Sequence, residues 1–294
     1  RARAGGKAVA LAALAAAGFR VPGVIVVSTE AYRWYVSETG LRERILLELN
    51  RKDFADLRWE EMWDAALRIR SMFLNTPLPA ALAAELAGPL EERFAGTPVA
   101  VRSSAPGEDA ANTSFAGLHE SYLNVRGVPR ILDHIRLVWA SLWSDRALLY
   151  RQELHLAIAT SRMAVVVQEL VPGERSGVVF GRNPLDPAQA VIEAVYGLNE
   201  GLVDGTVEPD RWIMDRTTGV VVSHTQPVRD KAVLLAASGT QVAVLDPAQC
   251  RDPPLTASEV SAILELARRG EACFGAPQDE IGRASCRERV WTVV

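Results

Sequence analysis

One continuous stretch, Val99 to Val125, constrains this chain more than any other. It begins with a short β-branched run that ends at Arg102, continues through a loop rich in Ser, Thr, Gly and Asn, and closes with a strand-like run, Ser121 to Val125. Arginine offers a planar fork of donors to an anion, and small residues let backbone N–H groups approach the same anion. The stretch therefore predicts two strands joined by an anion-binding loop, with a plain polar hairpin as the alternative.

The composition is that of an ordinary globular protein. Of the 294 residues, 49% are hydrophobic and 23% are charged, which is enough for a large core and for two lobes. The net charge of -4 argues against a nucleic-acid partner, because such proteins usually carry a basic patch. The three cysteines are odd in number and lack metal-ligand spacing, so a disulfide framework and a zinc site are both unsupported. A reducing, cytoplasmic location fits best.

The first residues imitate a secretory signal, because Arg1, Arg3 and Lys7 precede the apolar run Ala8 to Ala17. The run is alanine-rich and too short to cross a bilayer, so we expect neither a signal nor a membrane partner. The chain does not begin with Met, and we expect it to be a fragment of a longer protein.

A candidate phosphate contact, Gly5-Gly6-Lys7, stands directly before that run. Glycines at the start of a helix present N–H groups to an anion, and a neighbouring lysine adds a cation. The Walker pattern is excluded, since no Ser or Thr follows the lysine and the glycine spacing differs. The alternative is an exposed lysine beside a flexible turn.

Apolar residues at three- and four-residue spacing predict helices from Thr29 to about Phe94, and one long amphipathic helix from about Pro129 to His155. We interpret the large aromatic residues of the first region as core, with base stacking by a tryptophan as the alternative. The residues interpreted as core are Tyr32, Tyr35, Trp59 and Trp63, and the candidates for base stacking are Trp34, Trp59 and Trp63.

Two further strands, Met163 to Leu170 and Val178 to Phe180, predict the passage from one lobe to the next. Glu193 then lies inside the apolar run Ala190 to Val195. A carboxylate in such a place needs a cation or donors, which Mg²⁺ held with phosphate oxygens would supply; an edge-strand glutamate in solvent is the alternative. His224, in a later strand, is expected to face water.

Several segments, taken together, resemble one family. Val99 to Val125 contains Val-Arg-Ser-Ser-Ala, Glu-Asp, Ser-Phe-Ala-Gly and Tyr-Leu-Asn-Val in that order, and the chain also carries Gly-Gly-Lys-Ala and Gln-Glu-Leu-Val-Pro-Gly. This order resembles the nucleotide-binding domain shared by phosphoenolpyruvate synthase, pyruvate phosphate dikinase and rifampicin phosphotransferase, over about residues 4 to 279. The resemblance implies an α+β, ATP-grasp-like fold with two lobes, 1–167 and 168–279, and the nucleotide between them. The first lobe would include a helical insert and the phosphate loop.

The resemblance also implies roles for residues at matching positions. Lys7 would contact the nucleotide phosphates, and Arg102 would stabilise the γ-phosphate. ATP and Mg²⁺ are the implied ligands, with Glu193 as the candidate metal ligand. The further nucleotide-binding residues would be Gly117 and Ser121 in and after the phosphate loop, and Gln168, Glu169 and Val171 at the adenine.

A dikinase of this kind passes a phosphoryl group from ATP to a histidine on a separate domain and then to pyruvate on a third. The resemblance therefore implies a phosphotransferase part, incomplete for turnover alone, whose partners are a phosphohistidine domain and an acceptor-binding domain. None of the four histidines here has the Ser-His context of the acceptor. The alternatives are a stand-alone or degenerate nucleotide-binding module, and the ATP domain of a rifampicin-type phosphotransferase.

The resemblance ends after residue 279. The family continues with an Ile-Glu-Trp-like strand and Gln-Ser-Arg-Pro, whereas Glu280 to Val290 has neither pattern nor periodicity. We expect 280–294 to be an atypical tail foreign to the fold, and we do not transfer a metal ligand to Glu280. Before the tail, Thr256 to Glu259 predicts a capping box that opens a helix reaching Gly270.

Overall fold

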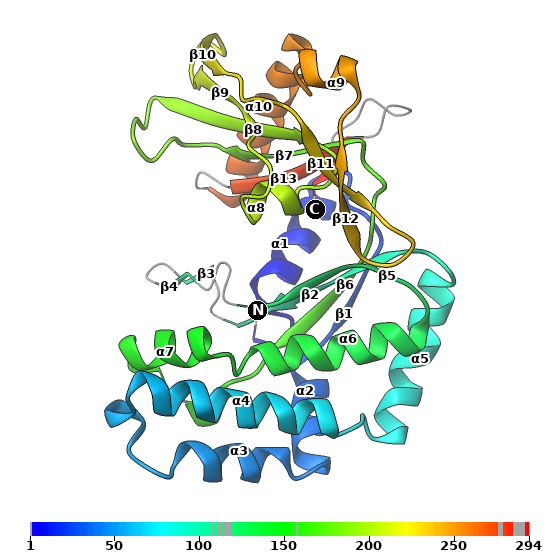
Figure 1. The fold of residues 1–294 in the computed structure, drawn as a ribbon, viewed down its shortest axis with the longest axis vertical. Helices are drawn as coiled ribbons and strands as arrows, with labels where there is room; N and C mark the ends of the chain where they lie inside the picture. Colours follow the sequence, from blue (N-terminus) through cyan, green and yellow to red (C-terminus); the bar gives the residue numbers. More distant parts are fainter. Residues whose placement is uncertain are drawn as a thin grey trace. The chain divides into compact units, whose positions relative to one another are not determined.

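The computed structural model describes residues 2–106, 109–110, 113–114, 119–156, 158–275, 279–284 and 292–293. The chain divides into two compact units (Figure 1). One unit is Arg1–Ala10 with Gly23–Leu170, and the other is Leu11–Pro22 with Val171–Val294. Both helices and sheets are abundant, which confirms the predicted α+β class. No helix of the described residues is long and apolar enough to cross a membrane.

The first unit is built on a four-stranded sheet in the order β1-β6-β2-β5, with every neighbouring pair antiparallel. The central strand β6 is buried along almost its whole length, which explains its run of valines without polar alternation. The strands are β1 Val24–Val27, β2 Val99–Ser104, β5 Ser121–Val125 and β6 Ala164–Glu169, and a two-residue pair, β3 Asp109–Ala110 and β4 Thr113–Ser114, lies between β2 and β5. The predicted strand that begins at Val99 and the predicted strand Ser121–Val125 are both confirmed, as β2 and β5.

Helices of the first unit pack on this sheet and on one another. Helix α6 packs on β2, β5 and β6, and α4 packs on α6 and α7. Tyr35 stacks on Trp139 at a centroid distance of 5.4 Å in the core. The helices are α2 Thr29–Glu38, α3 Leu41–Leu49, α4 Trp59–Asn75, α5 Ala80–Phe94, α6 Val128–Ser141 and α7 Asp145–Glu153, with 3-10 turns at Phe54–Asp56 and Ile158–Thr160.

The predicted single helix from Pro129 to His155 is wrong, because the structure has two helices separated at residues 142–144. Ser144 caps the second helix by accepting the Ala147 N–H at 3.2 Å. Buried Arg151 donates to the carbonyl oxygens of Leu142, at 2.7 Å, and Ala147, at 3.2 Å. A local cap and a buried guanidinium therefore satisfy the backbone groups that the break releases.

The tryptophans of the helical region do not lie in the core, although Tyr32 and Tyr35 do. Trp34, Trp59 and Trp63 are 36%, 59% and 46% exposed. On α4 the buried face carries Met62, Ala65, Ala66, Ile69 and Phe73. The two α4 tryptophans fall on the adjoining strip of the helix, so helical spacing alone assigned them to the wrong face.

The second unit contains a six-stranded sheet in the order β10-β9-β8-β7-β13-β14 and a separate pair, β11 and β12. Helix α10 packs on β7 and β8, and its predicted capping box between Thr256 and Glu259 is confirmed. Helix α1, Gly5–Ala16, belongs partly to each unit. The other elements are β7 Arg175–Phe180, β8 Gln189–Tyr196, α8 Glu200–Val203, β9 Asp210–Asp215, β10 Val221–Thr225, β11 Lys231–Leu235, β12 Thr240–Val244, α9 Pro247–Arg251, α10 Ala257–Phe274, β13 Asp279–Ala284 and β14 Thr292–Val293.

Strand β13 lies where the sequence shows no strand pattern. It pairs antiparallel with β7, from Asp279 opposite Phe180 to Ala284 opposite Arg175. Such pairing is made by backbone groups, so it does not require side-chain alternation in the added strand. The interpretation of 280–294 as a tail foreign to the fold stays a prediction.

Candidate functional site

Lys7 is held at the start of α1 by a close contact between Gly5, the first residue of the helix, and the end of β2. Gly5 has a φ of 77°, and a Cβ on it would lie 2.0 Å from the carbonyl oxygen of Ser104. The Ala8 N–H donates to Ser104 Oγ at 3.2 Å. Only glycine fits this approach, so the glycine before the lysine has a structural reason to be there.

Arg102 and Gln168 meet on neighbouring strands of the first unit. Arg102 lies opposite Val166 in the register of β2 and β6, so Gln168, two residues further along, is its diagonal neighbour on the same face. The Arg102 Nη1 donates to Gln168 Oε1 at 3.4 Å. On the other side of β2, Arg102 is opposite exposed Ser121 of β5. The sheet thus brings together three of the predicted residues.

The side-chain amide of Gln168 has a hydrogen-bond donor without a partner among the described residues. The residue is fully buried, and its Nε2 has no hydrogen-bond partner among the residues that the structure describes. Because nearly all buried polar groups in proteins are hydrogen-bonded, such a donor calls for an acceptor. A ligand with an acceptor atom beside Arg102 would supply it.

His119 lies close enough to Lys7 to respond to its charge. Removal from water, together with the charges of Arg151 and Lys7, lowers the pKa of His119 to about 3, although a contact with the Ser141 carbonyl opposes them. The imidazole is therefore neutral at pH 7. Its neighbour Glu120 accepts hydrogen bonds from Arg70, at 2.5 Å, and from the Tyr122 hydroxyl. This clamp ties the chain before β5 to α4.

Glu193 lies in the second unit, within a sheet and beside a cation of the protein. Its strand β8 has a neighbour on each side, so the edge-strand alternative is wrong. The carboxylate is directly across from Arg211 of β9 and forms an ion pair with it at 3.4 Å, with 19% of its side chain exposed. Among the described residues, no group of three or more His, Cys, Asp or Glu side chains gathers as a metal site. The role of Glu193 as a metal ligand stays a prediction.

The expectation that His224 faces water is also wrong. Its Nε2 is 2.8 Å from Asp210 Oδ1, and its ring stacks on Trp212 at a centroid distance of 4.3 Å. Asp210 is only 2% exposed and accepts two hydrogen bonds from Arg229, at 2.5 and 2.6 Å. The register of β9 and β10 creates this network, and sequence spacing gave no sign of it.

The remaining predicted residues are placed as follows. Glu169 is exposed at the end of β6, and its N–H donates to the Gly23 carbonyl at 2.8 Å. Val171 is half-buried and opens the long segment of the second unit. Gly117 lies outside the described residues. The first unit therefore holds Lys7, Arg102, Ser121, Gln168 and Glu169, and the second holds Val171 and Glu193.

Comparison with known proteins assigns this arrangement to a family. A family model described as pyruvate phosphate dikinase, AMP/ATP-binding domain, matches residues 1–280. The chain belongs to this family. The match to the dikinase AMP/ATP-binding domain includes every predicted site residue, from Lys7 to Glu193.

Individual relatives of this dikinase domain carry several names. A rifampicin phosphotransferase from a Streptomyces species is 37% identical over 265 residues, which is 89% of this chain and 30% of that protein. The phosphoenolpyruvate synthase of Aeropyrum pernix is 39% identical over 241 residues, 78% of this chain and 29% of that protein. A prodigiosin synthesizing transferase of Serratia marcescens is 32% identical over 292 residues, 98% of this chain and 31% of that protein. The chain thus spans roughly a third of each of these relatives.

Proposed function

We propose that this ATP-binding domain adopts the two-lobe ATP-grasp-like arrangement and serves a phosphoenolpyruvate synthase-like dikinase. It binds ATP and exposes a phosphoryl group to a histidine on another domain, from which the group passes to pyruvate. The pair of Arg102 with buried Gln168 supports this proposal, because a cation lies in hydrogen-bond contact with an amide whose N–H donor has no partner among the described residues. The proposal places the reaction in the cytoplasm, where ATP is available.

The roles follow from what phosphoryl transfer requires, which is positioning and neutralisation of charge. Lys7 and Arg102 offset the negative charge of the phosphate oxygens, and Lys7 is held for this by the glycine contact with β2. The Gln168 amide donates to an acceptor of the nucleotide. Other contacts in the proposal are Gly117 and Ser121 with the phosphates, and Glu169 and Val171 with the adenine.

The donor set is compatible with magnesium bound together with a nucleotide. Mg²⁺ commonly takes one or two protein carboxylates and fills its other positions with phosphate oxygens and water, so the single carboxylate of Glu193 would suffice if it exchanged Arg211 for the ion. When bound, Mg²⁺ would neutralise charge on the phosphates. Lys7 and Arg102 supply the positive charge that this chain contributes itself.

In the transfer step, the bond between phosphorus and its bridging oxygen breaks, and a bond to an imidazole nitrogen of the acceptor histidine forms. The rest of the nucleotide leaves with the bridging oxygen. The acceptor is proposed to lie in a phosphohistidine domain, and pyruvate in an acceptor-binding domain. The lengths of the relatives, about three times that of this chain, support the presence of such domains in the whole protein.

Calorimetric titration with Mg–ATP tests the site. Arg102→Met and Lys7→Met should each weaken binding by at least about tenfold, because a hydrogen bond to a charged group contributes roughly 1.5–3 kcal/mol. Arg44→Met, which removes an exposed arginine of α3, is the matched control and should bind like the unchanged chain. Equal affinity in all four proteins would refute the assignment.

A second candidate function is the ATP domain of a rifampicin-type phosphotransferase. Two Streptomyces relatives with that name, 37% and 38% identical, favour it. The full-length protein, incubated with ATP and either pyruvate or rifampicin, separates the two by the phosphorylated product. ATP binding without transfer to either acceptor would favour the third candidate, a nucleotide-binding module without catalytic turnover.

A further inference from the structure

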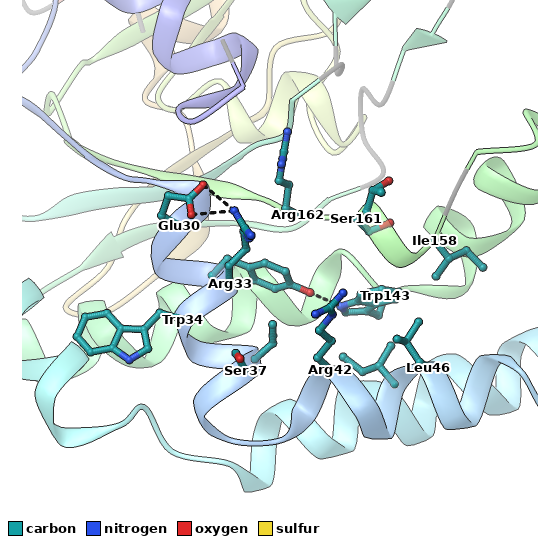
Figure 2. A pocket seen from close by; sticks show the side chains of 14 residues that line it. Glu30, Arg33, Trp34, Ser37, Arg42, Leu46, Trp143, Ile158, Ser161 and Arg162 are labelled. Carbon is teal, nitrogen blue, oxygen red and sulfur yellow. Dashed lines mark hydrogen bonds and ion pairs between the residues drawn. The ribbon is translucent and has the colours of Figure 1, made fainter.

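One cavity lies wholly within the first unit. It has a volume of about 550 Å³ and is lined by α2, by α3, by Trp143 after α6, and by Ile158 and residues 160–162 (Figure 2). This volume is within the range of small-molecule sites. Lys7, Arg102 and Gln168 are not among its lining residues. We call it the α2–α3 pocket.

The α2–α3 pocket carries uncompensated positive charge. Three arginines from three segments line it, Arg33, Arg42 and Arg162, against a single carboxylate, Glu30 (Figure 2). Arg33 pairs with the Glu30 carboxylate and donates hydrogen bonds to its two oxygens, at 3.0 and 3.3 Å. Across the described part of the chain, Arg42 and Arg162 form neither a hydrogen bond nor an ion pair. Two guanidinium groups are therefore available to an anion.

A buried hydroxyl adds a neutral donor to the same pocket. Tyr32 is 3% exposed, lines the pocket, and accepts the Trp143 Nε1–H at 3.1 Å. Its own proton has no acceptor among the described residues. Burial raises the pKa of Tyr32 well above its ordinary value, so the hydroxyl keeps that proton at neutral pH. A ligand acceptor is what this donor lacks.

Part of the remaining lining is apolar, and it comes from helix α3 and from segments after α6. Ile45 and Leu46 of α3 line it together with Ile158 and the indole of Trp143. A bare inorganic ion would leave these side chains without a partner. An apolar body attached to the anionic group would bury them and gain from the hydrophobic effect.

We propose that the α2–α3 pocket binds a small organic anion, a carboxylate or phosphate joined to an apolar body, separately from the nucleotide. The anionic group is held by Arg42 and Tyr32 with added charge from Arg162, and the body lies against Ile45, Leu46 and Ile158. Arginine recognises both anions through its planar fork, so the chemistry of the anionic group is decided by experiment.

Calorimetric titration of the chain with four probes tests the proposal. The probes are 1-naphthoate, phenyl phosphate, inorganic phosphate and neutral 1-naphthylmethanol. At least one organic anion should bind at a single site, and the tighter of the two identifies the anionic group. Inorganic phosphate and 1-naphthylmethanol should each bind at least about tenfold more weakly, because each lacks one half of the recognition.

Variants locate the binding. Arg42→Met should weaken the tighter anion by at least about tenfold, whereas Arg44→Met, on the same helix but not among the lining residues, should leave it unchanged. Saturating Mg–ATP should not displace the anion. The proposal is overturned if neither organic anion binds, if Arg42→Met with Arg162→Met binds as tightly as the unchanged chain, if the neutral probe binds equally well, or if Mg–ATP competes.

Discussion

Replacing Gly5 by alanine tests the close contact between the start of α1 and the end of β2. A residue with a side chain pays about 1–2 kcal/mol to adopt a left-handed conformation, and Gly5 has a φ of 77°. Its new Cβ would lie 2.0 Å from the Ser104 carbonyl oxygen, whereas real Cβ atoms essentially never approach within 3.0 Å. The first turn of α1 must therefore move away from β2 by about 1 Å, the difference between these two distances.

That movement lengthens two hydrogen bonds that the first turn of α1 donates to the end of β2 and the residue after it. The Gly6 N–H donates to the Ala105 carbonyl at 3.3 Å, and the Ala8 N–H donates to Ser104 Oγ at 3.2 Å. At about 1 kcal/mol each, their loss brings the expected decrease in the free energy of unfolding to about 3–4 kcal/mol. Gly96→Ala is the matched control, because Gly96 has a φ of 71° and a Cβ added to it would meet nothing within 4 Å. It should lose only about 1–2 kcal/mol.

Urea unfolding followed by tryptophan fluorescence measures both losses, and calorimetry measures Mg–ATP affinity in the same proteins. Gly5→Ala should bind Mg–ATP more weakly, since the first turn of α1, which carries Lys7, has moved, while Gly96→Ala should not. If the free energy of unfolding falls equally in the two variants, the close contact of Gly5 with Ser104 does not restrict the residue at position 5. If Gly5→Ala alone loses stability but retains its affinity, Lys7 does not need this anchor.

Three more perturbations test features of the two units. Asp210→Ala should cost about 3–5 kcal/mol in urea unfolding, because it leaves the buried guanidinium of Arg229 unpaired; a loss below about 1 kcal/mol would contradict this. Arg151→Met should cost about 1–3 kcal/mol in the same assay, because the carbonyl of Leu142, at the break after α6, loses the guanidinium that donates to it. The pKa of His119 is about 3 in the folded chain against 6.5 for an ordinary histidine, so the unfolded chain binds more protons between these values. Stability should therefore fall as pH drops below about 6.5, and His119→Gln should reduce that slope in thermal melts.

Much of the fold could be predicted because its strands and helices carry clear patterns. The run Ser121–Val125 begins and ends in the structure where the sequence indicates. Errors arose where a pattern continued across a boundary. The apolar periodicity passes through Ser144, although Ser followed by Asp is a helix-start signal that identifies the break once it is considered. The segment Leu11–Pro22 belongs to the second unit although the residues on either side of it belong to the first. This assignment depends on tertiary packing, and no local pattern in the sequence indicates it.

The site was predictable where its residues belong to local motifs and unpredictable where they meet through register. Lys7 and Arg102 stand out because cations beside small residues suit an anion. The clamp of Arg70 on Glu120 joins residues 50 positions apart, and no periodicity connects them. The Glu193 ion pair with Arg211 likewise exists only because β8 and β9 pair in one register. Contacts of this kind require knowledge of the strand order.

Strand β2 turns the separate motifs into one arrangement. Because Arg102 is paired with Val166, the side chain of Gln168 lies on the same face of the sheet and reaches the guanidinium. A slip of one residue between β2 and β6 would send the two side chains to opposite faces. Two residues after Arg102, Ser104 contacts the first turn of α1, which carries Lys7. The anion-binding character of this stretch therefore depends on the register of β2 as much as on the residues within it.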